Sequence, residues 1–395
     1  MIAHPGISLV DGDIGGDIGR IGRLRIAGTR IESIDGEPAR YDRVVDLRGD
    51  RVLPGLINAH DHLQLNNFGR LKCREQHANV REWIEDVSML KQTSRSIKAT
   101  AATPLDPRLL LGGVKNLLSG VTTVAHHDPL YASLTMDTFP IRVVRDYGWS
   151  HSLLIDGDER VRTSYRHTPS EWPWIIHAAE GLDDAAHAEF ERLEALNCIG
   201  ANTLIVHGVA LDASQMNRLG AAGAGLIWCP TSNLHLFGVT ADASALIRRG
   251  QVALGSDSRL SGGRDLLDEL AVAREVGGFD EPTLEHLVTA GSARLLRLHD
   301  RGVLRTNAAA DLIVLPPQLP LSRATRADIR LVMVEGRMLY ADLHYAAALA
   351  PASQWLEVLV DGRPKALDRT LALRLAESDV REPGLDIPTA SWRAA

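Results

Sequence analysis

The feature that most constrains the fold is a series of short apolar runs that alternate with helical segments after Pro54. Seven runs stand out: LINAH, VTTVAHH, WSHSLLIDG, WIIHAAE, TLIVHG, GLIWCP and VALGSDS. Helical candidates at residues 107–119, 183–196, 213–220 and 264–276 fall between several of them. Repeated strand and helix units build a parallel sheet with right-handed crossovers, either doubly wound or closed into a barrel. The pattern therefore predicts an α/β fold.

Polar and chemically active residues end several of these runs, and their position favours a barrel. (β/α)8 barrels keep their active sites at the carboxyl ends of their strands. We therefore expect a TIM-like (β/α)8 barrel over residues 54–301. Residues 1–53 and 302–345 instead contain short apolar pieces separated by Gly and Asp, a pattern typical of small strands and turns. We expect these two segments to pair as a small β-sandwich domain, and residues 346–395 to form a helical and loop extension.

Composition excludes several classes of function. The chain has 395 residues, is 24% charged and carries a formal net charge of −7, whereas nucleic-acid binders normally show a basic face. We therefore expect a small-molecule substrate and no nucleic-acid partner. Three cysteines without paired spacing favour a reducing compartment. The sequence shows neither a leader-like start nor an apolar run of about 18 residues, so we expect a cytoplasmic protein with no membrane partner.

Five potential ligands or catalytic groups stand at equivalent strand ends. His60 and His62 close the first run, and His177, His207 and Asp257 close three others. Side chains of a strand alternate between its two faces, so His60 and His62 project together. Zn²⁺ and Fe²⁺ accept neutral imidazole and carboxylate, and a catalytic site keeps one position open for water. The sequence therefore predicts a catalytic metal centre.

Further residues near these strand ends are candidates for catalysis or substrate binding. Glu180 lies three residues beyond the histidine of WIIHAAE, close enough to shuttle a proton. Gln64 follows the first histidine pair, where a substrate contact and a plain surface amide are both open. His126 and His127 close the second run, and alternation directs one of them to the pocket and the other away. Asn233 is either a turn residue or a substrate contact.

Six motifs in order, PGLINAHDH, HAAE, VHG, CPTSN, GSDS and AAADLIVL, resemble those of the amidohydrolase superfamily. The resemblance is strongest to the branch that contains guanine and cytosine deaminases and triazine hydrolases, and it extends over roughly residues 20–340. It implies one divalent metal ion, zinc in first place and iron as the alternative. The implied ligands are His60, His62, His177 and Asp257. Glu180 and His207 would be catalytic residues outside the ligand set.

Two features of the sequence refine this resemblance. Binuclear members bridge their ions with a carboxylated lysine on the fourth strand or a substitute carboxylate. None of the five lysines ends a run between VTTVAHH and WIIHAAE, so one ion is expected. Residues 158–173 are also too few for the helix, strand and helix that this branch usually places there. The barrel should therefore be distorted, either with a short fourth strand within residues 159–169 or by a rearrangement at that point.

The expected activity is hydrolytic deamination of a small aminated heterocycle by a water that the metal activates. Asp257 would accept a proton from this water, Glu180 would protonate a ring nitrogen, and His207 would stabilise the developing charge. Hydrolysis of an amide, a lactam or a C–Cl bond is the alternative. A non-catalytic assembly protein of the same fold would be expected to have lost ligands, yet all four are present. A homo-oligomer stays open, because members of this branch are often dimers or larger.

Overall fold

The structure is a computed structural model that describes residues 6–14 and 21–388. Residues 1–5, 15–20 and 389–395, which belong to the predicted segments 1–53 and 346–395, lie outside the described residues. Eight strands follow one another through the predicted barrel segment, and all their ladders are parallel. They are β6 (Leu56–Asp61), β7 (Val121–His126), β8 (Arg142–Val143), β9 (Gly148–Ser152), β10 (Trp174–Ala178), β11 (Thr203–His207), β12 (Gly225–Trp228) and β13 (Val252–Leu254).

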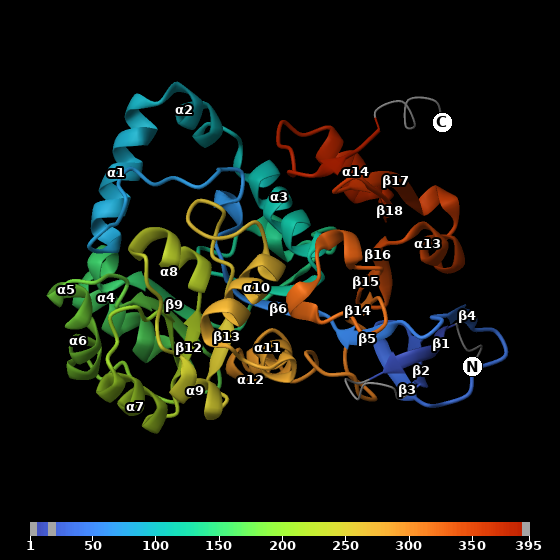
Figure 1. Cartoon of the computed structure of the whole chain (residues 1–395), viewed down its shortest axis with the longest axis horizontal. Helices are drawn as coiled ribbons and strands as arrows, with labels where there is room; N and C mark the ends of the chain where they lie inside the picture. The colour runs from blue at the N-terminus through green and yellow to red at the C-terminus, as the bar shows by residue number, and fades with distance from the viewer. Residues whose placement is uncertain (1–5, 15–20, 389–395) are drawn as a thin grey trace.

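These strands form two arcs rather than one closed barrel (Figure 1). The first arc has the order β6-β7-β8, and the second has the order β13-β12-β11-β10-β9. Among the described residues, no ladder joins β8 to β9 or β13 to β6. The predicted α/β class with parallel strands is confirmed, whereas the predicted barrel is open at these two places.

One strand of the two arcs has no counterpart among the seven apolar runs. It is the third strand, β8. Its two residues pair with Thr123 and Val124 of β7, and residues 144–147 then lead directly into β9. A crossover between neighbouring parallel strands needs about a dozen residues or more, so no helix fits between β8 and β9. WSHS is consequently the fourth strand. The prediction of a short fourth strand within residues 159–169 is wrong, because residues 153–167 form helix α4 (Leu153–His167).

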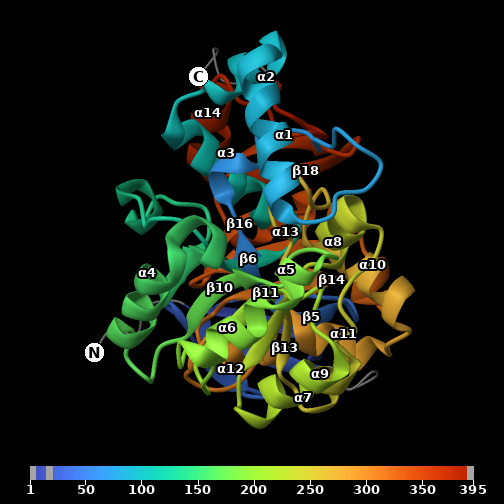
Figure 2. The same cartoon turned by 90° about the vertical axis from the view of Figure 1, so that its left-hand side faces the viewer.

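Helices cover the outside of the two arcs, and side-chain caps start several of them. The N-cap side chains of three helices accept hydrogen bonds from backbone N–H groups in the first turn, which stabilises the helix start. They are Asn79 in α1, Asp212 in α7 and Asp265 in α10. The helices besides α4 are α1 (Val80–Thr93), α2 (Arg95–Ala101), α3 (Leu105–Leu118), α5 (Asp184–His187), α6 (Glu189–Ala195), α7 (Ala213–Ala221), α8 (Pro230–Phe237), α9 (Ser244–Arg248), α10 (Leu266–Gly277), α11 (Glu281–Leu287), α12 (Ala290–Leu295), α13 (Leu343–Leu349) and α14 (Arg369–Ala376). Helices α1 and α2 stand above the barrel strands in both views (Figures 1 and 2). Within the described ranges, none of the helices is both long and apolar enough to span a bilayer.

Strands from the two ends of the chain meet in one sheet, as the pairing of segments 1–53 and 302–345 predicts. Its join is the antiparallel pair β5–β14, which puts the blue and orange strands side by side in Figure 1. Hydrogen bonds link eleven strands in this sheet. They are β1 (Ile7–Ile14), β2 (Ile21–Ala27), β3 (Arg30–Ile34), β4 (Arg43–Asp46), β5 (Arg51–Pro54), β14 (Leu312–Leu315), β15 (Leu331–Val334), β16 (Arg337–Ala341), β17 (Trp355–Val360), β18 (Arg363–Asp368) and β19 (Leu385–Asp386). The division into domains at residues 54, 302 and 346 stays a prediction.

The C-terminal extension differs from the expected helix and loop. Residues 346–395 contribute β17, β18 and β19 to the large sheet, and β18 pairs with β16. In β17 the side chains of Leu356, Val358 and Val360 are buried, whereas Glu357 and Leu359 are exposed. This period of two is the pattern of a half-buried strand. Helix α14 is a helical part of this extension.

Apolar side chains fill the inside of the arcs on the amino-terminal side of the site. The buried cluster includes Ile57, Ile175, Val206, Ile227 and Ala253, one residue from each of five strands. Their packing leaves the carboxyl ends of the strands to polar groups. The fold therefore brings the predicted ligands to one edge.

Candidate metal centre and active site

Three imidazole nitrogens and one carboxylate oxygen converge at the carboxyl ends of β6, β10 and β13. The Nε2 atom of His177 lies 3.3 Å from Nε2 of His60 and 3.3 Å from Nε2 of His62. Oδ1 of Asp257 lies 3.7 Å from Nε2 of His60 and 3.9 Å from Nε2 of His62. All four side chains are buried. These are the four residues predicted as metal ligands.

The spacing of these atoms fits a single zinc-sized ion. Zn²⁺ binds histidine nitrogen and carboxylate oxygen at about 2.0–2.2 Å, which separates neighbouring ligand atoms of a tetrahedral site by about 3.3–3.6 Å. The observed separations of 3.3–3.9 Å are close to this range. The donor set of three imidazoles and one carboxylate suits zinc and iron alike. The four side chains therefore fit a zinc or an iron ion.

Each of the three imidazoles has its Nδ1 atom engaged by a partner, which leaves Nε2 for a metal. Nδ1 of His62 lies 2.6 Å from the Asp128 carboxylate, and Nδ1 of His177 donates to the backbone oxygen of His151 at 2.7 Å. Nδ1 of His60 lies 3.3 Å from Nδ1 of His127. Such outer partners fix the tautomer and orientation of metal-binding histidines.

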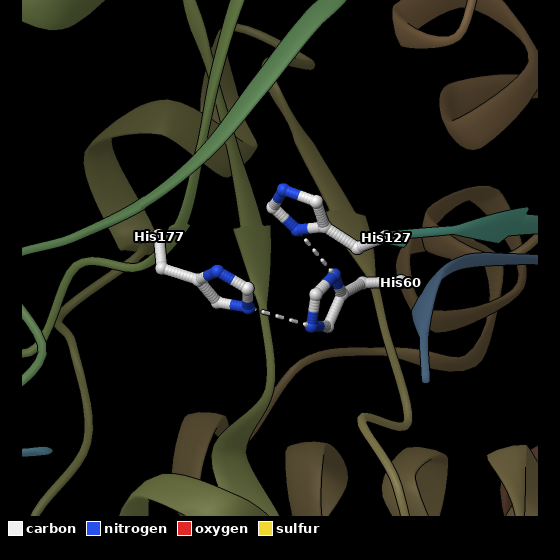
Figure 3. A group of neighbouring side chains, drawn as sticks. All are labelled: His60, His127 and His177. Atoms are coloured by element: carbon white, nitrogen blue, oxygen red, sulfur yellow. Dashed lines mark hydrogen bonds between the residues drawn. The ribbon is translucent and has the colours of Figure 1, made fainter. Parts of the chain in front are cut away.

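His127 completes a short relay behind His60 (Figure 3). Its Nε2 donates to the backbone oxygen of Ser150 at 2.9 Å, so its Nδ1 is the acceptor for the Nδ1–H of His60. Burial and the neighbouring imidazoles lower the pKa of His60, His127 and His177 well below the usual value, which keeps these rings neutral. His127 was one of two alternatives, with His126, for a contact to the substrate; the structure places its ring against the candidate ligands, with its centroid 4.2 Å from that of His177.

His126 points away from this cluster, as alternation along β7 requires. Its Nδ1 accepts a hydrogen bond from the backbone of Leu63 at 3.4 Å, and its ring lies 6.1 Å from that of Tyr131. Gln64, the other predicted contact in this region, donates to the Asp128 carboxylate at 2.7 Å. Gln64 Oε1 is buried and has no hydrogen-bond partner among the residues that the structure describes. The amide oxygen of Gln64 is therefore free for a ligand, whereas its nitrogen supports Asp128.

Asp257 is held as a carboxylate by a dense set of donors. Ser232 and Ser261 hydroxyls donate to Oδ2 at 2.9 and 2.7 Å, and the Ser258 backbone N–H donates to Oδ1 at 2.7 Å. Although burial raises the pKa of Asp257, the nearby histidines and these donors lower it below the usual value. Asp257 therefore presents a negatively charged Oδ1 to the three imidazoles.

Glu180 and His207 lie next to each other at the edge of the ligand cluster. Glu180 Oε1 is 3.6 Å from His207 Nε2, and the His207 ring centroid is 5.5 Å from that of His177. Burial, with Asp257 and Glu189 nearby, raises the pKa of Glu180 well above the usual value, so this carboxyl holds its proton. His207 Nδ1 lies 2.9 Å from Asn233 Oδ1 and donates to it, which leaves the Nε2 lone pair facing the site. Asn233, predicted as a turn or substrate residue, orients His207.

Left-handed backbone conformations aim several of these side chains. His207 and Asp257 have φ angles of 72° and 49°, and Ala179, which precedes Glu180, has a φ of 54°. For residues other than glycine such angles cost about 1–3 kcal/mol each and cluster at functional sites. The inner residue of β11 is Val206, so a regular strand would direct His207 outward. The change of direction at the strand end therefore brings the imidazole into the site.

The backbone of Glu180 is also tied to the segment that enters α1. Val80 N–H donates to the Glu180 carbonyl at 3.0 Å, and Leu182 N–H donates to the Ala78 carbonyl at 2.7 Å. A side chain at Gly181 would meet Asn79, with its Cβ only 2.8 Å from the Asn79 Cβ. The helices above the barrel and the Glu180 loop therefore form one packed unit.

Comparison with known proteins agrees with this geometry. Residues 167–339 match the amidohydrolase family. A 5-methylthioadenosine/S-adenosylhomocysteine deaminase of Syntrophobacter fumaroxidans is 27% identical over 370 residues, which cover 77% of this chain and 83% of that protein. The corresponding deaminase of Haloquadratum walsbyi is 26% identical, with 74% of this chain and 79% of that protein covered. The predicted resemblance to the amidohydrolase superfamily is thereby confirmed.

Solved structures of superfamily members show the same fold. This chain superposes on a triazine hydrolase from Arthrobacter aurescens with a TM-score of 0.69 at 17% identity, covering 88% of this chain and all of the other. It superposes on an adenosine deaminase from Xanthomonas campestris with bound zinc with a TM-score of 0.68 at 17% identity, covering 89% and 97%. The predicted enzyme class, a hydrolase acting on C–N bonds, agrees with the family match and the names of the curated relatives.

Several residues that complete the site are not predicted from the sequence. Asp128, Ser261 and the His151 carbonyl contact the candidate ligands, the Ser150 carbonyl contacts His127, and Glu189 accepts the Ala179 N–H at 2.8 Å. A local signal existed only for Asp128, which directly follows the His126–His127 pair. The other partners come from separate strands and helices, so only the fold identifies them.

Proposed function

We propose that this amidohydrolase is a zinc-dependent hydrolytic deaminase of an aminated purine nucleoside of the adenosine type. The observation that carries the proposal is the convergence of three imidazole Nε2 atoms and the Asp257 oxygen at metal spacing, with Glu180 and His207 beside them. The names of the curated relatives, which include a 5'-deoxyadenosine deaminase of Methanothermobacter thermautotrophicus, support the substrate class.

The reaction exchanges an exocyclic amino group for oxygen. When bound, the metal supplies a nucleophile by lowering the pKa of a water molecule towards about 7. The water oxygen forms the new bond to the ring carbon that carries the amino group, and the bond from this carbon to the amino nitrogen breaks. The products are the keto form of the ring and ammonia.

Glu180 and Asp257 would divide the proton transfers. Glu180 is the acid, because burial and the neighbouring Asp257 and Glu189 raise its pKa well above the usual value. It would give its proton to the ring nitrogen next to the reacting carbon, which makes that carbon more electrophilic. Asp257 is the base that takes a proton from the attacking water and passes it to the leaving amine, and the second proton of the water returns to Glu180 as the carbonyl group forms. The different environments of the two carboxyl groups support this assignment.

His207 would orient the attacking water. Its Nδ1–H donates to Asn233, so Nε2 can accept a hydrogen bond from the water. The partial positive charge of the Nδ1–H group lies nearby. Gln64 Oε1, buried and without a partner among the described residues, would accept a hydrogen bond from the substrate.

We further propose that the metal is zinc rather than iron and that one ion is bound. We propose a cytoplasmic location and, as an open alternative to a monomer, a homo-oligomer.

The test is a substrate panel with purified, zinc-loaded protein. The panel contains 5-methylthioadenosine, S-adenosylhomocysteine, 5'-deoxyadenosine and adenosine, together with an aminotriazine, a chlorotriazine and a lactam. Ammonia release and the absorbance change from adenine to hypoxanthine are measured in parallel, with Glu180→Gln as the matched inactive control. Ammonia from the adenosine derivatives supports the proposal. Turnover of only the lactam or the chlorotriazine would replace it with the alternative hydrolase activity.

A further inference from the structure

The metal ligands straddle a seam of the barrel that has no backbone ladder. His60 and His62 stand at the end of β6, and Asp257 follows β13, yet β6 and β13 are not paired as strands in the described part of the chain. One backbone bond crosses the seam next to the ligands, from Asp257 N–H to the His60 carbonyl at 3.1 Å. Side chains supply the other connections there. The relative position of the ligands therefore depends on those side chains.

Lys115 of α3 crosses this seam with a single ammonium group. Its Nζ donates to Asp61 Oδ2 at 3.1 Å, to Ser256 Oγ at 3.1 Å and to the backbone oxygen of Asp257 at 3.2 Å. Asp61 lies between the two histidine ligands of β6, and Ser256 precedes the aspartate ligand. An ammonium has three donors, so this set uses all of them. Lys115 and Asp61 are both completely buried.

The surroundings of Asp61 show that this network is saturated. Asn66 donates to Oδ1 at 2.8 Å, and Asn116 donates to Oδ2 at 2.8 Å. Asn58, on β6, donates to Ser256 Oγ at 2.8 Å and accepts the Ser256 N–H at 3.0 Å. These amides join the same two strand ends as Lys115. Lys115 supplies the charge that balances Asp61 and the contact to the carbonyl of a metal ligand.

We propose that Lys115 is a positioning residue for the metal centre, which fixes the Asp257 end of β13 against the His60–His62 end of β6. It touches no metal ligand side chain, and it acts through the Asp257 carbonyl, Ser256 and Asp61. Its removal should let the strand ends separate and weaken metal binding. Loss of an outer partner of a metal ligand typically weakens metal affinity by about 10- to 100-fold.

Two variants separate positioning from simple charge balance. Lys115→Met removes the ammonium and leaves Asp61 buried without its cation. The double variant Asp61→Asn with Lys115→Met removes both charges, so no unpaired charge is buried. Lys365→Met is the matched control, because Lys365 is a buried lysine that donates to the Ile329 carbonyl and pairs with Asp342 in the large sheet. Lys115→Gln provides a neutral side chain that keeps a hydrogen-bond donor.

Zinc affinity is measured by competition with a chromophoric chelator on metal-free protein, and each variant's unfolding temperature is measured without metal. The visible absorption of bound Co²⁺ reports the ligand geometry independently of activity. We expect the double variant to bind zinc about 10- to 100-fold more weakly than the parent protein, with an altered Co²⁺ spectrum, even where its unfolding temperature is close to the parent's. Lys365→Met should bind zinc with unchanged affinity.

Unchanged zinc affinity in the folded double variant would overturn the inference, since Lys115 would then only neutralise Asp61. An equal loss of affinity in Lys365→Met would also overturn it. Failure of all Lys115 variants to fold would assign Lys115 to folding and reject a specific role at the metal. The inference rests on the proposed metal-dependent function, and the titration separates the two. A parent protein that binds no zinc refutes both, whereas normal binding by the parent and the double variant refutes only the inference.

Discussion

Replacement of Glu382 by Gln tests how strongly the C-terminal extension is coupled to the active-site loop. Glu382 is completely buried between two arginines. Its carboxylate accepts hydrogen bonds from Arg259 at 2.9 and 2.5 Å and forms an ion pair with Arg326 at 2.6 Å, and Arg326 also pairs with Asp265 at 2.6 Å. Arg259 lies two residues after the ligand Asp257. The variant keeps the size of the side chain but leaves two buried guanidinium groups with one carboxylate.

The expected loss follows from the burial of all four charges. Removal of one partner from a buried ion pair costs about 3–5 kcal/mol, because the remaining charge has neither water nor a counter-ion. Stabilities of natural proteins are about 5–15 kcal/mol, so the loss is a large fraction of the total. With a urea m-value near the upper end of about 1–3 kcal/mol/M, the midpoint should fall by about 1–2 M.

The assay is urea unfolding at neutral pH, followed by tryptophan fluorescence and circular dichroism. Glu377→Gln is the matched control, since Glu377 belongs to the same extension and is exposed. Exposed substitutions of this kind usually change stability by less than about 0.5 kcal/mol. Burial alone would raise the pKa of Glu382, but Arg326 and Arg259 lower it below the usual value. The stabilising effect of Glu382 is therefore complete above about pH 4.3, the value for an unfolded glutamate, and is lost as the pH falls further.

A Glu382→Gln midpoint no lower than that of Glu377→Gln, with an unchanged m-value, would refute this reasoning. The buried network would then not hold the extension in place. A difference that persists unchanged below pH 3 would refute the ionic origin of the effect.

Three further predictions concern the metal and the catalytic groups. Glu180→Gln should lower kcat by about 10²- to 10⁴-fold, as loss of an acid catalyst does, with zinc affinity unchanged; a loss of less than fivefold would contradict the assigned role. Asp128→Asn should weaken zinc binding by about 10- to 100-fold because it removes the carboxylate charge that faces His62 Nδ1, while Gln64→Ala, which leaves that charge in place and removes a donor to Asp128, should change zinc affinity far less. Removal of metal by a chelator should abolish activity, and zinc at 100 times its Kd should stabilise the protein by about 2.7 kcal/mol in calorimetry; activity that survives complete metal removal would contradict the proposed function.

Local patterns in the sequence determined the chemistry of the site. His60, His62, His177, His207 and Asp257 follow apolar runs, and the carboxyl ends of parallel strands meet at one edge, so their convergence could be predicted. Glu180 was found by its distance along the chain from His177. These inferences need only the period of a strand and the direction of the sheet, which neighbouring residues encode.

The tertiary structure decided the contacts between distant segments. It showed that His127 supports His60 rather than the substrate, that the rudimentary strand is the third one, and that residues 355–360 extend a sheet begun by the N-terminus. It also brought Lys115 to the seam between β6 and β13. The physical reason is that a side chain's own neighbours set its strand or helix, whereas its partner for a buried charge or hydrogen bond comes from wherever the folded chain places one. The sequence by itself therefore determined which residues are the candidate metal ligands, and only the fold decided what holds them there.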